Sequence, residues 1–147
     1  MEIFGTSSAL IYDINLIIQI ILVTAFLIDA FVIKPKRRLK AHGTIMATGT
    51  VINLLAVLLI MGPSLIRNWG AIAADPTNLG ALITLAHASL GILALSGGVV
   101  FSYRFLSGVK SNKLACGKRR SMRLAILFWT LGLLLGLGFY VYYYVLV

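Results

Sequence analysis

Acidic residues are scarce in this sequence. Its 147 residues include four Asp and Glu against thirteen Lys and Arg, and charged residues make up 12% of the chain. Soluble domains usually carry about a quarter charged residues. Hydrophobic residues reach 60%, so the composition argues against a soluble globular protein. Cysteine is also scarce: Cys116 stands alone, which excludes an internal disulfide, and no histidine lies near it in the sequence.

The signatures of independent catalysis are missing as well. We find no Cys-x-x-Cys pair, no glycine-rich phosphate loop and no Ser/His/Asp arrangement. We therefore do not expect an independent enzyme. The net charge of +9 does not indicate a nucleic-acid partner, because the basic residues are concentrated in two short runs beside long apolar stretches.

Four apolar stretches are long enough to cross a membrane. Each reaches the roughly 20 residues that a helix needs to cross about 30 Å of hydrocarbon. Their continuous apolar character favours helices over a β-barrel, whose strands alternate. Short connections make neighbouring helices antiparallel. The sequence thus predicts one all-α integral membrane domain over residues 1–147, an up-down four-helix bundle with spans near 11–33, 41–61, 79–106 and 125–146, and an outer loop over 62–78.

The basic residues predict the orientation of this bundle. Five lie in the run from Lys34 to Lys40 and seven between Arg104 and Arg123, which leaves only Arg67 for the second connection. Cytoplasmic loops of membrane proteins collect Lys and Arg. We therefore expect the first and third connections to be cytoplasmic, both termini to be extracytoplasmic, and the protein to be a multi-pass protein of a prokaryotic plasma membrane.

Several polar residues interrupt the spans. Asn15 and Gln19 are four residues apart and share one face of the first helix, and Asn53 lies in the second. Asp29 precedes Lys34 by about one turn. A carboxylate inside hydrocarbon is costly, so it is either paired or functional. We expect an ion pair with the basic run that follows, or a pair with another span.

Small and aromatic residues mark the third and fourth spans. Gly132 and Gly136 form a G-x-x-x-G pair, a signal for close helix packing. Tyrosines crowd the end of the fourth span and are typical of an interfacial aromatic belt; they are Tyr140, Tyr142, Tyr143 and Tyr144.

Two histidines are the candidates for haem or metal ligation. Haem iron accepts His or Met as axial ligands, so we single out His42, Met46, Met61 and His87. His42 opens the second span, whereas His87 lies about eight residues inside the third. Their predicted heights differ by about 20 Å, which argues against one haem held between them. Met46 follows His42 by one turn and could join it in a copper site, since thioether sulfur suits Cu(I). The alternative is a histidine that only bonds a neighbouring helix, such as His42 with Asp29.

The segments around these histidines resemble a known family. Residues 39–46, LKAHGTIM, and 84–90, TLAHASL, are similar to the second and third spans of the domain-of-unknown-function 420 family of small prokaryotic membrane proteins. Residues 118–123, KRRSMR, with Trp129 and the glycines before Tyr140, resemble its fourth span. The resemblance implies a four-span protein associated with respiratory chains and, in some members of the family, with haem–copper oxidase maturation. Further family histidines are expected where this chain reads Gly62-Pro63-Ser64 and Arg119-Arg120.

Three functions remain open at this point. The first is an accessory or assembly subunit of a respiratory complex that binds haem b or copper through His87 or His42. The second is a purely structural subunit that packs against a larger membrane complex or its own copies. The third is a small transporter, in which Asp29, Gln19, Asn15 and Asn53 line a polar path.

Overall fold

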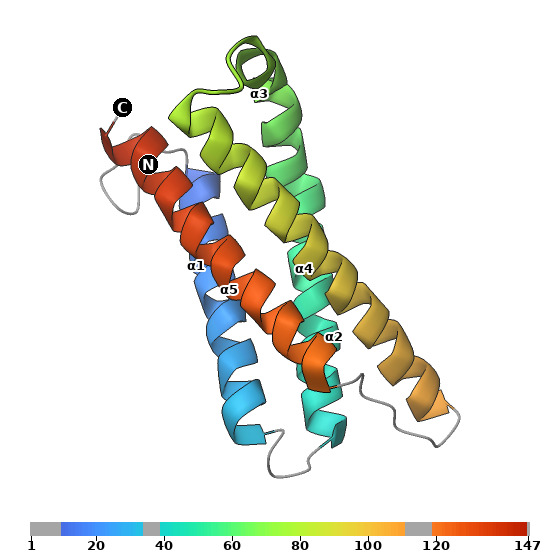
Figure 1. The fold of residues 1–147 in the computed structure, drawn as a ribbon. Helices are drawn as coiled ribbons and strands as arrows, with labels where there is room; N and C mark the ends of the chain where they lie inside the picture. Colours follow the sequence, from blue (N-terminus) through green and yellow to red (C-terminus); the bar gives the residue numbers. More distant parts are fainter. Residues whose placement is uncertain (1–9, 34–38, 111–118, 147) are drawn as a thin grey trace.

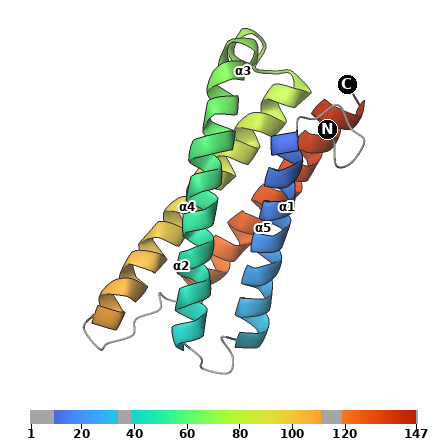
Figure 2. The same cartoon turned by 180° about the vertical axis from the view of Figure 1, so that it is seen from behind.

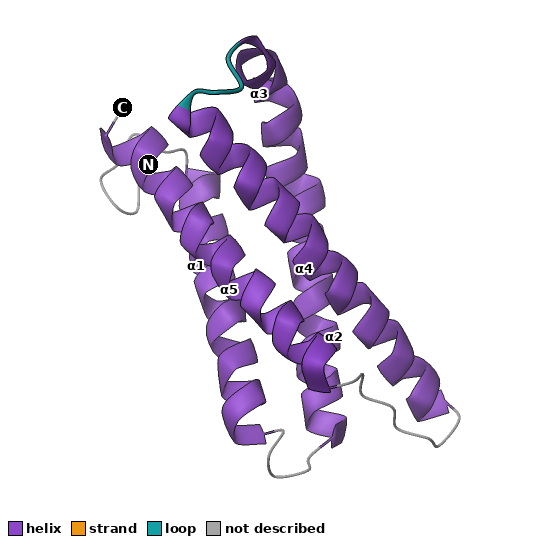
Figure 3. Cartoon of the chain, viewed as in Figure 1, coloured by secondary structure: helices purple, strands orange, loops and turns teal. Residues whose placement is uncertain are grey.

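The fold is built almost entirely from helices (Figures 1 and 3). A computed structural model describes residues 10–33, 39–110 and 119–146. The elements are α1 (Leu10–Ile28), a π-helical turn η1 (Asp29–Ile33), α2 (Leu39–Ala56), a π-helical turn η2 (Val57–Met61), α3 (Gly62–Ala74), α4 (Leu79–Lys110), α5 (Arg119–Val141) and a π-helical turn η3 (Tyr142–Leu146).

Four long helical rods form the bundle. α1 packs against α2 and α5, and α4 packs against α2 and α5, so the rods form a ring in the order α1, α2, α4, α5. Successive rods run in opposite directions, and α1 begins at the end of the bundle where η3 finishes (Figures 1 and 2). The predicted all-α, up-down arrangement is confirmed.

Each rod is long and apolar enough to cross a membrane. The candidate spans are Leu10–Val32, Leu39–Ala74, Leu79–Lys110 and Arg120–Val145. Many large apolar side chains on their outer faces are exposed, including Phe31, Leu59 and Ile92. Such a surface suits contact with lipid or with another membrane protein.

The second rod is longer than the sequence predicted. A loop was expected after Met61, but the helix continues as α3 to Ala74, and Pro63 lies in its first turn. Proline is tolerated there because the missing N–H costs little in a first turn. The π-helical turn η2 comes directly before it, and the Gly62 N–H donates to the Val57 carbonyl. The 36 residues of this rod give a helical path of about 54 Å, more than a hydrocarbon layer of about 30 Å requires, and the end of α3 turns across the end of the bundle (Figures 1 and 2).

The core lies at mid-height, where three of the rods supply large side chains. It contains Leu22, Phe26, Met46, Ala94 and Trp129. The Phe26 and Trp129 rings meet edge to face with centroids 4.6 Å apart. The Trp129 Nε1–H donates to the Ala94 carbonyl at 2.9 Å, so this buried indole leaves no unpaired donor.

Two glycines allow α2 and α4 to approach closely. A Cβ on Gly98 would lie 2.7 Å from Thr50 Oγ1, and a Cβ on Gly43 would overlap the Phe105 ring. These two contacts also define the register of the antiparallel pair. Gly43 of α2 lies level with Phe105 of α4, and Thr50, seven residues further along α2, lies level with Gly98, seven residues earlier in α4.

Substitution of Gly43 tests this packing. We expect Gly43→Ala to destabilise the protein by about 1–3 kcal/mol through overpacking against Phe105, measured as thermal unfolding in detergent. The matched control is Gly138→Ala, because nothing lies within 4 Å of a Cβ at that position. Equal effects of the two substitutions would contradict the close approach of α2 to α4.

Candidate functional site

Two buried ionisable residues form a pair between the first and second rods. Asp29 begins η1, His42 lies in the first turn of α2, and their exposed fractions are 0% and 1%. The His42 Nδ1 is hydrogen-bonded to the Asp29 Oδ2. This is the inter-helix pair that the sequence suggested as an alternative to a metal site. The other suggested partners of Asp29, in residues 34–38, lie outside the described residues.

His87 occupies a different joint, between α4 and α5. Its Nδ1 is 2.8 Å from the Gly132 carbonyl oxygen, to which it donates. A Cβ on Gly136 would lie 2.9 Å from the His87 Cε1, so this glycine makes room for the ring. The predicted G-x-x-x-G pair therefore packs around the histidine: one glycine supplies an acceptor and the other supplies space.

The two histidines are far apart along the bundle. In the register set by the Gly43–Phe105 and Gly98–Thr50 contacts, His42 lies level with Leu106 of α4. His87 is 19 residues away along that helix, or about 28 Å. A single iron cannot be ligated by both.

The two methionines also lie in different surroundings. Met46 is buried among apolar side chains of the core, together with Phe26 and Trp129. Met61 is half-buried at the end of η2. The α2–α4 register puts Met61 level with His87. Met61 belongs to η2, however, and the main contacts of α4 are with α2 and α5. Within the described residues, no group of three His, Cys, Asp or Glu side chains is placed to hold a metal ion.

The polar residues proposed to line a path are divided by the core. Gln19 donates to Asn53 at 2.9 Å, which ties α1 to α2 in one half of the bundle. Leu22 and Phe26 then follow on α1 before Asp29 is reached. In this conformation an apolar layer separates the Gln19–Asn53 pair from the Asp29–His42 pair, so these groups do not form a continuous polar path.

A second buried carboxylate contact was missed by the sequence analysis. The Tyr140 hydroxyl donates to the Asp13 Oδ1 at 2.5 Å, and both residues are buried. This bond joins the first helix to the last. The tyrosines were interpreted as an interfacial belt, and the aromatic rings do gather there: Tyr144 stacks on Tyr12 with centroids 5.6 Å apart. The signal available in the sequence was Asp13 itself, an acid inside an apolar stretch.

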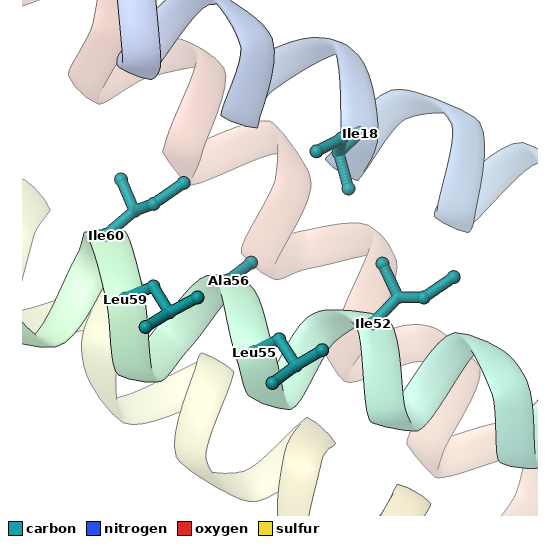
Figure 4. Close-up of a pocket in the computed structure, with 6 residues that line it drawn as sticks. All are labelled: Ile18, Ile52, Leu55, Ala56, Leu59 and Ile60. Atoms are coloured by element: carbon teal, nitrogen blue, oxygen red, sulfur yellow. The ribbon is translucent and has the colours of Figure 1, made fainter.

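An apolar groove lies on the outside of the α1–α2 joint (Figure 4). It measures about 200 Å³, and Ile18 of α1 faces aliphatic side chains of α2 and η2 across it. Those side chains are Ile52, Leu55, Ala56, Leu59 and Ile60. This lining offers no hydrogen-bonding side chain, so the groove is suited to aliphatic chains and supplies no chemistry.

Comparison of the chain with protein-family models, with curated protein sequences and with solved structures finds no match. The resemblance to the domain-of-unknown-function 420 family therefore depends on the sequence motifs alone.

The Asp29–His42 pair can be tested by a double-mutant cycle. Removing one partner of a buried pair typically costs about 3–5 kcal/mol, because the other is left unpaired. We expect His42→Leu and Asp29→Leu each to destabilise strongly in thermal unfolding, and the double substitution to cost clearly less than their sum. Additive effects would show that the pair does not couple α1 to α2.

The Asp13–Tyr140 bond has a natural matched control. We expect Tyr140→Phe to lower the free energy of unfolding by about 1–3 kcal/mol, since a buried acceptor loses its donor. Tyr103→Phe should have no measurable effect, because Tyr103 is 71% exposed. Equal stability of both variants in the same detergent would contradict the bond.

Proposed function

We propose that this chain is a small integral-membrane accessory or assembly subunit of a respiratory complex of the haem–copper oxidase type, in which His87 or His42 binds haem b or copper. Four candidate membrane spans and the resemblance of the histidine segments to a respiratory family support the proposal.

The geometry of the two imidazoles is the observation that carries the metal assignment. In both histidines Nδ1 is held by an oxygen of another helix, a carboxylate for His42 and a backbone carbonyl for His87. Histidines that ligate metals almost always donate their second ring nitrogen to such an acceptor, which fixes the tautomer and orients the ring. The nitrogen left for a metal is Nε2 in each case.

The two positions suit different groups. His87 lies beside Gly132, where nothing lies within 4 Å of an added Cβ, and small residues permit close approach of a flat ligand. His42 has Met46 one turn away on the same helix, so these two cannot take opposite faces of a haem, although both are acceptable ligands for Cu(I). In either position the remaining ligands would come from elsewhere in the complex, and the bound group would supply redox chemistry.

Orientation follows from the distribution of charge in the bundle. Lys40, Lys110 and Arg120 lie at the end where α1 finishes, whereas Arg67 belongs to α3 at the opposite end. By the positive-inside rule the end with the basic residues faces the cytoplasm. Both termini are then extracytoplasmic, as expected for a multi-pass protein of a prokaryotic plasma membrane.

A purely structural subunit is the second candidate, and one observation favours it. Both histidine bonds join neighbouring helices, His42 to α1 and His87 to α5. These bonds satisfy polar groups inside the bundle without any ligand. In this reading the exposed apolar faces bind a larger membrane complex or other copies of the chain.

Absorption spectra and metal analysis of the purified protein distinguish the two candidates. The accessory-subunit proposal predicts a Soret band or bound copper, and loss of that signal in His87→Ala or His42→Ala with the helical content unchanged. The structural candidate predicts no pigment and no copper, with the histidine variants losing thermal stability alone. Protein isolated from its native membrane without haem or copper would refute the metal assignment.

A further inference from the structure

One end of the bundle carries basic side chains and no exposed acid in the part of the chain that the structure describes. Five exposed cations occupy the ends of three helices there, and we call them the basic belt: Lys40, Arg104, Lys110, Arg120 and Arg123. The acid at this end, Asp29, is fully buried and bonded to His42. The positive charge of the belt is thus not offset by nearby described carboxylates.

The arginines of the belt lie at similar depths. Trp129 donates to the Ala94 carbonyl, and a Cβ on Gly97 would lie 3.5 Å from the Ala125 Cβ. This antiparallel register places Arg123 level with about residue 99 of α4 and Arg120 level with about residue 102. Together with Arg104 itself, the three guanidinium-bearing residues fall within about 8 Å along the bundle.

The lysines of the belt lie farther out. In the α2–α4 register, Lys40 is level with about residue 108, and Lys110 is six residues beyond Arg104, or about 9 Å. The belt therefore has two layers, with arginines nearer the apolar middle of the bundle and lysines nearer the end. In a bilayer this order puts the arginines closest to the hydrocarbon boundary, where lipid phosphates lie.

We propose that the basic belt binds anionic phospholipid, with the phosphates held by the arginines. The planar guanidinium donates two parallel hydrogen bonds to a phosphate, a geometry that lysine cannot offer. Lysines beyond the phosphates act as point charges that attract a negatively charged headgroup. An uncompensated belt favours a lipid with net negative charge over a zwitterionic lipid, which brings its own cation.

This inference rests on the membrane location given above, but not on haem, copper or a respiratory partner. The experiment uses the full chain in nanodiscs that contain either phosphatidylglycerol and phosphatidylcholine together or phosphatidylcholine alone. Lipid retained after transfer to detergent is counted by native mass spectrometry. The test variant is R104Q/R120Q/R123Q and the matched control is R67Q, which removes the exposed arginine of α3 at the opposite end.

We expect the wild-type chain and R67Q to retain phosphatidylglycerol in preference to phosphatidylcholine, with a preference that weakens as salt is raised. At about fivefold for each basic residue near an anionic surface, the triple variant should lose roughly a hundredfold in preference. We expect the fold of the triple variant to be unchanged, because the three side chains are exposed. Circular dichroism and tryptophan fluorescence, to which Trp69 and Trp129 both contribute, verify this.

Equal retention of the two lipids by the wild-type chain, or an unchanged preference in the triple variant, overturns the inference. If the triple variant instead loses a co-purifying protein while its phosphatidylglycerol remains, the belt is a protein-docking surface and the lipid assignment is wrong. Failure of the wild-type chain to enter either bilayer overturns the membrane location together with this inference.

Discussion

Hydrocarbon offers no hydrogen bonds, so every polar group carried into a membrane must find a partner inside the protein. The α1 helix shows how this constraint shapes the bundle. Asp13 is bonded by Tyr140 of α5, Gln19 by Asn53 of α2, and Asp29 by His42 of α2. The Asp13 and Asp29 bonds lie near the two ends of the first rod, and the Gln19 bond lies between them. Together they hold this rod against both neighbours.

The same bonds limit what the bundle can do by itself. Phe26 and Trp129 close the middle with an apolar layer, so the polar groups serve as separate joints and do not form a path. His42 takes part in one of these bonds, whereas His87 bonds the Gly132 carbonyl between α4 and α5, at a different depth of the bundle. The two histidines therefore do not form a common centre.

The two ends of the bundle differ in charge and in shape. One end has the exposed cations of α2, α4 and α5. The opposite end has the extra turns of α3 with exposed Ile66 and Trp69, and the aromatic contacts around Tyr144. Indole and phenol rings favour the boundary between lipid and water, and basic residues favour the cytoplasmic boundary. The asymmetry fits a protein held in one orientation across a bilayer.

The sequence by itself determined the number of long apolar spans, their antiparallel order and the polar residues that need partners, because long apolar stretches and acids within them are local signals. It also suggested the His42–Asp29 pair, since only a short connection separates the two. The continuation of the second span through Pro63 into α3 was not foreseen, because a proline before polar residues resembles the start of a loop. Only the tertiary structure decided that Asp13 meets Tyr140, 127 residues away, and that Gly132 and Gly136 pack on His87. Such contacts depend on helix rotation and register, which packing between the helices sets.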